Sequence, residues 1–430
     1  MKRKNLRKII SVGIVTIMMG GSLTACTEVS AITDNSSVSS SVTDSNEDTS
    51  ESGSEEINEK AVEKAEENVS EKADEKATEK ADDSSSTSSS VSAGEEIVLE
   101  NDKDINITSG GKYQVSGASK NSTIYVDTED EVEIVLSGVS MENQTAPCIY
   151  VKNADKVTIS TENESTLSVT GSFEADGDTN LDAVIFSKDD LIMDGSGILN
   201  VNSSDNAITS KDDLEIKNGT YNIQCTGNAM EAHDEIEISE GTINITGCND
   251  GLHAEDSDDD SIGSVLITGG TFNINATDDA IHGTTTVQID GGDMTLVGGE
   301  CIEGTYITIN DGSIDISASD DGINAAAKSS KYSTPTFEMN GGDVTINMGA
   351  GDTDGVDSNG DIYINGGNLS ITGQSTFDYD GNAVYNGGTI IENGTATNTI
   401  TNQMMGGPNG GFGKGFGGGM GPDNNNHRGF

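Results

Sequence analysis

A short motif carrying an oxygen-bearing side chain recurs along most of the chain. Each copy has Asp, Asn or Glu, then Ala, Gly or Cys, then an apolar residue, and successive copies lie 21 to 33 residues apart. Carboxylate and amide oxygens are the ligands that Ca²⁺ prefers, so these positions are candidates for cation binding. We call them the motif ladder: Asp182, Asn206, Asn228, Asp250, Asp279, Glu300, Asp321, Asp354 and Asn382.

A second set of side chains lies three residues further on in every copy. Neighbouring side chains of an extended strand point to opposite faces, so the apolar residue of the motif points inward and the next one outward. The resulting outer ladder reads Ile185, Thr209, Glu231, His253, His282, Glu303, Asn324, Asp357 and Tyr385. We expect it to be exposed, and we predict the ligand contact face as Glu231, His253, His282, Glu303, Asn324 and Asp357.

Carboxylates stacked about 4.8 Å apart repel one another unless protons or cations neutralise them. We therefore predict Ca²⁺ as a cofactor, with the ligands Asp250, Asp279, Glu300, Asp321 and Asp354. The acidic run 256–260 offers further oxygens. The alternative is that Asp and Asn sit here because they suit turns and accept hydrogen bonds from backbone N–H groups. His253 with His282 is a further candidate, for a transition metal.

The same ladders are poorly equipped for catalysis. A calcium-assisted lyase needs a Lys or Arg base, and residues 218–327 contain neither; Lys188, Lys211 and Lys217 lie on earlier turns, off the outer ladder. Asp278-Asp279 with His282 resembles the acid pair and His of polygalacturonases, but the Arg and Lys that clamp substrate in that family have no counterpart. We predict no catalytic residue.

The spacing of these motifs predicts the element that carries them. Each repeat of about 22 residues holds three short stretches of alternating apolar and polar residues, such as 214–216, separated by Gly-bearing turns such as Gly291-Gly292. Stacked triangles of short strands bury their inward side chains only against their neighbours. We predict an all-β fold, a right-handed parallel β-helix with three strands per turn and roughly ten turns. A propeller is disfavoured because its blades need about 40 residues.

Three segments near the start of this region carry a family resemblance: 107–117 (ITSGGKYQVSG), 132–139 (VEIVLSGV) and 146–149 (APCI). They resemble the opening of clostridial carbohydrate-binding β-helix proteins, which are similar to polysaccharide lyases in fold. The resemblance runs from about Ile97 to Ile391. It implies binding of cellulose-like or pectin-like polymers and the presence of calcium.

Composition divides the chain into four parts. Residues 1–26 have a basic start, an apolar stretch and Leu23-Thr24-Ala25-Cys26, which resembles a lipoprotein box; Cys26 is then lipidated. The alternative is an ordinary secretory signal cut near Ala25. We expect a disordered Ser/Glu/Lys-rich tether at 27–93, the β-helix at 94–400 and a disordered Gly-rich tail at 401–430. The protein would stand outside the cell, held on the membrane by its lipid anchor only.

Charge and aromatic content limit the partners. The formal net charge of −52 excludes nucleic acid, and we expect a monomer. No Trp is present and Tyr and Phe are scattered, apart from Phe377, Tyr379 and Tyr385, so flat stacking on cellulose is poorly supported. Ca²⁺ can bridge the acidic protein to an acidic polymer. Cys225 and Cys248 lie one repeat apart, as a disulfide or as buried thiols.

These observations predict a membrane-anchored extracellular protein whose β-helix binds an acidic pectin-like or a cellulose-like polysaccharide with the help of calcium and without catalysis. Two alternatives remain open. One is a polysaccharide lyase or polygalacturonase-like hydrolase on the same scaffold. The other is a structural or adhesive surface protein, in which the ladders only satisfy the turns.

Overall fold

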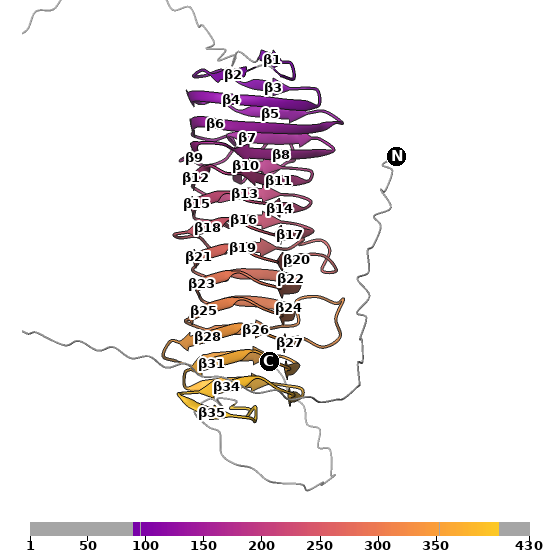
Figure 1. Cartoon of the computed structure of the whole chain (residues 1–430). Helices are drawn as coiled ribbons and strands as arrows, with labels where there is room; N and C mark the ends of the chain where they lie inside the picture. Colours follow the sequence, from indigo (N-terminus) through magenta and orange to yellow (C-terminus); the bar gives the residue numbers. More distant parts are fainter. Residues whose placement is uncertain (1–88, 95, 352, 404–430) are drawn as a thin grey trace, which may run out of the picture. The chain divides into compact units, whose positions relative to one another are not determined.

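A computed structural model describes residues 89–94, 96–351 and 353–403 (Figure 1). The described residues form a stack of about 13 turns of parallel β-strands, with no helix among them. The predicted right-handed parallel β-helix is confirmed. The stack is taller than the roughly ten turns expected, because the first turns lack the motif used to count them.

One face of the stack, here the motif face, carries both ladders. Its strands pair in parallel from each turn to the next, and β22 and β24 belong to it only with their first residues, before bending into the second face. The strands are β1 (Ser89–Val91), β3 (Ile105–Ile107), β5 (Ile124–Asp127), β7 (Ile149–Asn153), β10 (Ala183–Ser187), β13 (Asn206–Ser210), β16 (Met230–Ala232), β19 (Leu252–Ala254), β22 (Ile281–Ile289), β24 (Ile302–Ile309), β26 (Asp321–Ala325), β29 (Asp354–Ser358) and β32 (Ser375–Tyr379).

The second face follows the motif face in each turn. Strands β2 (Glu96–Leu99), β4 (Gly111–Lys120) and β6 (Glu131–Asn143) open the stack, and β4 and β6 continue from the second face into the third. The remaining strands of the second face are β8 (Lys156–Thr161), β11 (Leu191–Gly195), β14 (Leu214–Ile216), β17 (Glu235–Ile238), β20 (Ser264–Ile267), β27 (Thr336–Met339), β30 (Asp361–Ile364) and β33 (Ala383–Tyr385).

The third face completes each turn. Its outward Asn200, Asn222 and Asn244 donate and accept side-chain hydrogen bonds from turn to turn at 2.9 and 3.0 Å. Its strands are β9 (Glu164–Val169), β12 (Ile198–Ser203), β15 (Thr220–Gln224), β18 (Thr242–Ile245), β21 (Thr271–Asn275), β23 (Asp293–Gly298), β25 (Ser313–Ala318), β28 (Asp343–Met348), β31 (Asn368–Thr372) and β34 (Thr389–Glu392), and β35 (Thr395–Thr397) closes the stack antiparallel to β34.

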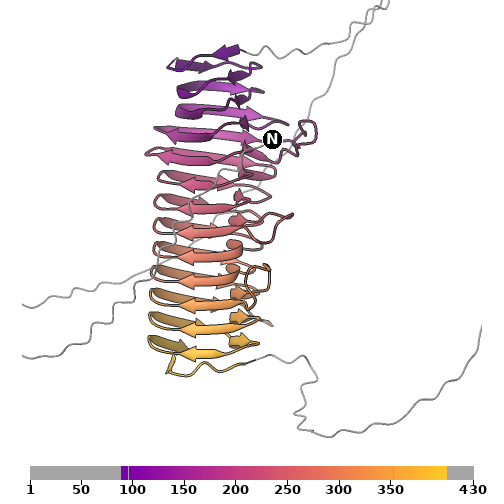
Figure 2. The ribbon, with the colours of Figure 1, turned by 90° about the vertical axis from the view of Figure 1, so that its right-hand side faces the viewer.

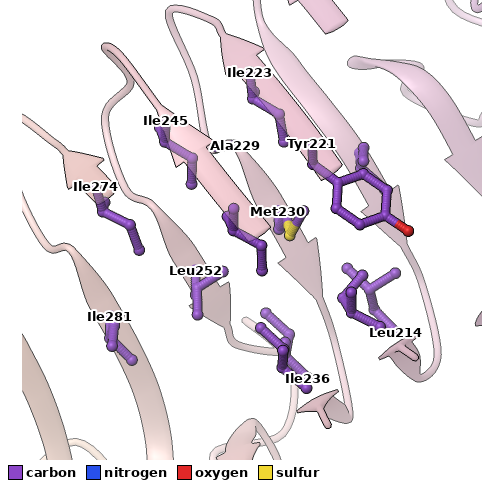
Figure 3. Close-up of a cluster of buried hydrophobic side chains, with 14 of the residues drawn as sticks. Leu214, Tyr221, Ile223, Ala229, Met230, Ile236, Ile245, Leu252, Ile274 and Ile281 are labelled. Atoms are coloured by element: carbon purple, nitrogen blue, oxygen red, sulfur yellow. The ribbon is translucent and has the colours of Figure 1, made fainter. Parts of the chain in front are cut away.

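Inward side chains of the three faces fill one narrow core (Figure 3). On the motif face, Met230, Leu252 and Ile281 lie directly above one another and are fully buried. The small residue of the motif sits where the chain of the next turn passes closely: a Cβ added at Gly251 would lie 2.4 Å from the carbonyl oxygen of Ala280. At Gly251 this close approach excludes any side chain, and the Ala and Cys residues at the equivalent positions of other turns are fully buried.

The register corrects the outer ladder at both ends. Phe186, not Ile185, lies opposite Thr209, because β10 enters one residue later than the motif suggests. At the other end Asp378 lies opposite Asp357, while Tyr385 belongs to the second face. In this turn the three residues directly before Asp378 are Ser-Thr-Phe. They lack the Asp, Asn or Glu that begins the motif, so the sequence pattern does not identify this turn.

Several expectations concern residues outside the described ranges. The signal peptide with Cys26, the tether up to residue 88 and the tail from residue 404 are among them. Strand β1 begins at Ser89, before the boundary expected at Gly94. No helix in the described part of the chain is long and apolar enough to cross a membrane.

The stacking brings Cys225 and Cys248 together as the repeat length suggests. Both are buried free thiols; Cys225 donates a hydrogen bond to the Gly227 carbonyl and Cys248 one to the Asn275 carbonyl. The neighbouring Cys225 and burial raise the pKa of Cys248. Cys148 and Cys301 are also free and buried. The thiol alternative, and not the disulfide, describes this structure.

Candidate functional site

All six residues of the predicted contact face come together in one column. Successive turns pair Glu231 with His253, His253 with His282, and His282 with Glu303. Glu303 is followed by Asn324 and then by Asp357. The alternation of each short strand, with its apolar residue packed inward, forces these side chains outward.

The expected exposure of this column is wrong. His282, Glu303 and Asn324 are only 4%, 3% and 8% exposed. Glu231, His253 and Asp357 are partly buried.

Two insertions explain this burial. They lie between β19 and β20 (255–263) and between β26 and β27 (326–335), and both project from the same side of the stack (Figure 2). They contact each other through Asp260, which accepts hydrogen bonds from the Ser329 hydroxyl at 2.5 Å and the Ser330 hydroxyl at 2.8 Å. Their first parts bring Glu255 and Lys328 against the column.

His282 is the centre of a buried charge network. Its Nδ1 lies 3.0 Å from Asp279 Oδ2 and 2.8 Å from Glu303 Oε2, and its Nε2 lies 3.5 Å from Glu255. Burial opposes the charged imidazolium, but the three carboxylates outweigh it and raise the pKa of His282 to about 11. The cation at the centre of the network is therefore the protonated side chain of His282 itself.

Lys328 is the partner that sequence reasoning missed. Its Nζ lies 2.7 Å from Glu303 Oε1. Burial raises the pKa of Glu303, but hydrogen bonds from His282 and Lys328 outweigh it and lower that pKa to about 2. The absence of Lys from residues 218–327 thus does not leave the central turns without a lysine, because one arrives from a later insertion. Sequence spacing gives no signal for such a contact.

His253 repeats this arrangement one turn earlier. Its Nδ1 lies 2.8 Å from Asp250 Oδ2, and its ring stacks on that of His282 with centroids 4.8 Å apart. At the start of the column Lys211 pairs with Glu231 at 2.8 Å. Lys211 lies off the outer ladder, as expected, but its side chain reaches the first carboxylate of the column.

The predicted calcium ligands divide into two groups. Asp250 accepts a hydrogen bond from the backbone N–H of Asp279 at 3.0 Å, and Asp321 one from the N–H of Asp354 at 3.1 Å, as the turn-based alternative expects. Glu300 accepts one from the Asn324 amide at 2.8 Å. Asp250, Asp279 and Glu300 thus have side-chain partners in the network, whereas Asp321 and Asp354 lie beyond it.

Carboxylates accumulate at the far end of the motif face. Asp357 lies opposite Asp378, and Asp321 opposite Asp354. Burial and neighbouring carboxylates raise the pKa of Asp321 to about 7 and that of Asp357 to about 6. Within the described residues, no lysine, arginine or histidine forms an ion pair with Asp321, Asp357 or Asp378. We call Asp321, Asp354, Asp357 and Asp378 the carboxylate cluster. Among the described residues, no three of them bring their oxygens within 4.8 Å of one another, but carboxylate oxygens are the ligands that Ca²⁺ prefers.

A further carboxylate group lies at the corner between the motif face and the second face. Oxygens of Asp190, Asp212 and Asp213 lie within 4.8 Å of one another. Asp279, His282 and Glu303 meet the same distance criterion, but the imidazolium already neutralises them. Sequence reasoning missed the corner group because these acids lie outside both ladders.

The early part of the outer ladder is aromatic. Tyr125, Tyr150 and Phe186 occupy the positions that precede Thr209, with ring centroids 5.9 and 5.7 Å apart. The sequence did not reveal this row, because the motif is absent from the first two turns and shifted by one residue in the third. We call this stretch the aromatic half of the motif face, and the stretch from Glu231 to Asp378 the acidic half.

Comparisons with known proteins place the chain in a family. A family model for the "Carbohydrate-binding domain-containing protein" matches residues 101–355. A protein of that description from Acetivibrio thermocellus is 35% identical over 126 residues, which make up 28% of this chain and 44% of the relative. The chain thus matches less than half of that relative's length.

A solved structure described as a polysaccharide lyase-like protein from C. thermocellum, in a gadolinium derivative, is 29% identical. The similarity covers 51% of this chain and 93% of that one, with a TM-score of 0.44. The family resemblance seen in the opening segments is confirmed. Because the family model spans more than half of the sequence, the chain belongs to the family of carbohydrate-binding domain-containing proteins.

Proposed function

We propose that the motif face binds an acidic polysaccharide, and that calcium at the carboxylate cluster contributes to this binding. Family membership supports a carbohydrate ligand. The observation that supports the calcium proposal is the stacking of Asp321 on Asp354 and of Asp357 on Asp378 in successive turns, where burial and neighbouring carboxylates raise the pKa of Asp321 and Asp357. Asp321, Asp354, Asp357 and Asp378 would hold the ion, and bound calcium would supply the charge that attracts a sugar carboxylate.

Binding without catalysis fits the charge state of the central network. The pKa of His282 is raised to about 11, and hydrogen bonding to Glu303 raises the pKa of Lys328 although burial opposes it. Both groups are therefore protonated near neutral pH, whereas a general base must be unprotonated to accept a proton. A lyase or hydrolase with these residues as base is correspondingly disfavoured.

Retention of polygalacturonate and of cellulose by the whole protein tests this proposal, with calcium and with a chelator. We expect polygalacturonate retention that falls in chelator, and the same fall in the double variant Asp357→Asn/Asp378→Asn. Asp315→Asn is the matched control, because Asp315 is an exposed outward aspartate of β25 on the third face. Failure to retain any polysaccharide would overturn the function. Polygalacturonate retention that is unchanged by chelator and by the double variant would show that calcium takes no part in binding.

We also propose that the protein is displayed outside the cell on a lipid anchor at Cys26. The basic start, the apolar stretch and the small residues before Cys26 support this proposal. Fractionation of cells after Cys26→Ala tests it. Loss of the protein from the membrane fraction is expected, and unchanged membrane association would contradict the anchor.

A further inference from the structure

We propose that Tyr125, Tyr150 and Lys152, in the aromatic half, form a separate subsite for a carboxylated sugar unit of the polymer, which binds without calcium. This inference rests on the proposed function, since it assigns a second place on the motif face where the same acidic polysaccharide is held. It differs from the carboxylate cluster in the sign of the protein charge that meets the ligand.

The side chains of this subsite line two open cavities. One of about 310 Å³ and one of about 210 Å³ share Tyr125 and Lys152 in their walls, so these residues stand where the two cavities meet. The Lys152 ammonium lies 4.8 Å from the centre of the Tyr125 ring and 5.0 Å from that of Tyr150. An amphipathic ring beside a fixed positive charge suits a uronate, which offers an apolar sugar face and a carboxylate.

Lysines follow the aromatic row from turn to turn. Lys152, Lys188 and Lys211 come directly after the inward residues of β7, β10 and β13. Backbone bonds from Lys188 N–H to the carbonyl of Val151 and from Lys211 N–H to that of Ser187 show that these positions stack. Between residues 94 and 400 the chain has ten lysines and no arginine, so three in one column concentrate positive charge. Acidic side chains of the protein already pair with two of these lysines, Asp176 with Lys152 and Asp182 with Lys211. An acidic polymer would bind this column by replacing those carboxylates, without a bridging cation.

A segment of the chain already places acidic groups on these lysines. It is the flap, residues 170–182 between β9 and β10. Asp176 Oδ2 lies 2.9 Å from Lys152 Nζ and accepts a hydrogen bond from the Tyr150 hydroxyl at 3.3 Å. Further along the flap, the Thr179 hydroxyl accepts a bond from Lys188 at 2.8 Å, and Asp182 lies 3.9 Å from Lys211.

Asp176 therefore stands in for the carboxylate of the ligand. The side chain is about half exposed (49%), and the turn around it, bridged between Asp176 and Thr179, is largely exposed too. The base of the flap is firmly held, because Leu181 is buried against the aromatic row. Tyr150 is itself only 1% exposed, so a uronate can take over the contacts with Lys152 and the Tyr150 hydroxyl only after the exposed turn has moved away. Hydrogen bonding to Lys152 lowers the pKa of Asp176, as expected where a carboxylate is favoured.

The test measures the affinity of the whole protein for a trigalacturonate in chelator, with cellotriose as the neutral comparison. Lys152→Gln should weaken trigalacturonate binding about tenfold, because a charged hydrogen bond is lost. Asp176→Asn should tighten it several-fold, because the internal competitor loses its charge. Lys120→Gln should change nothing: Lys120 pairs with Glu142 at 3.0 Å in a similar exposed ion pair on the third face.

The outcomes separate this inference from the proposed function. Equal trigalacturonate affinity for the wild type and Lys152→Gln, or weaker binding by Asp176→Asn, would overturn the subsite. Polygalacturonate retention in calcium would then still support the proposed function. No retention of polymer by the wild type under any condition would overturn both. Unchanged thermal unfolding of Lys152→Gln shows that lost affinity does not come from a lost fold.

Discussion

The two halves of the motif face occupy equivalent positions of the same repeat, but they differ in charge. In the aromatic half, lysines at the strand ends meet acidic groups delivered by the flap. In the acidic half, carboxylates stack on successive turns, and His282 and Lys328 neutralise only its middle. If both proposals hold, an acidic polymer has two modes of attachment to one scaffold, direct pairing with lysine and bridging by calcium.

Burial separates the halves as strongly as charge does. The Lys152–Asp176 pair is at the surface, where an ion pair contributes little to stability and exchanges readily with a ligand. The His282 network is enclosed by the two insertions, where removal of one partner leaves an uncompensated charge. The first arrangement suits an exchangeable contact and the second a fixed structural element.

The largest expected effect is on the stability of the acidic half. His282→Ala should lower the free energy of unfolding by about 3–5 kcal/mol, because Asp279 is then left buried without a cation and Glu303 keeps only Lys328. Denaturant unfolding measures it. Adding Glu303→Gln to the variant should restore part of the loss. If His282→Ala is as stable as the wild type, the interaction of His282 with the buried carboxylates makes no net contribution to stability.

Calcium should stabilise the acidic half by a smaller amount. With a dissociation constant of about 10⁻⁴–10⁻³ M, as in many extracellular modules, 10 mM calcium adds about 1.4–2.7 kcal/mol. A rise in the melting temperature with calcium measures it. The rise should disappear in Asp357→Asn/Asp378→Asn and persist in Asp315→Asn. An equal rise in both variants would place the ion elsewhere.

Asp321 in the acidic half and Asp176 in the aromatic half should respond to pH in opposite directions. The pKa of Asp321 is raised to about 7 in the folded protein, from an ordinary value of 3.8, so without calcium this residue destabilises the fold progressively as pH rises from about 4 to 7. The pKa of Asp176 is lowered from 3.8, so its contribution is present above that value and is lost as pH falls below it. Hydrogen exchange of β29 and of the flap, measured across pH, separates the two trends. Parallel pH trends would contradict this difference.

The smallest effect belongs to the exposed pair of the aromatic half. Asp176→Ala should change the free energy of unfolding by less than about 1 kcal/mol. The Lys152–Asp176 ion pair is solvated, and the base of the flap is held independently by the buried Leu181. Denaturant unfolding checks this beside the His282→Ala series. A loss comparable to that of His282→Ala would show that the flap is a structural element and not an exchangeable one.

The sequence by itself determined the scaffold. A small residue recurs where the next turn approaches closely, as at Gly251, and the neighbouring apolar residue must point inward to fill a core that no single turn can build. These two local constraints fix the period, the strands and the outward position of the column from Glu231 to Asp357. They recur in most turns, so one chain suffices to reveal them.

Only the tertiary structure decided which of these side chains are exposed and what they contact. Lys328 reaches Glu303 from an insertion, and Asp260 joins that insertion to another one, 70 residues away in sequence. A one-residue shift replaces Ile185 by Phe186 and completes an aromatic row that the motif does not mark. Repeats constrain only the residues that pack against the next turn, whereas loops and register shifts are set by contacts distant in sequence, so the lysine and aromatic partners could not be read from spacing.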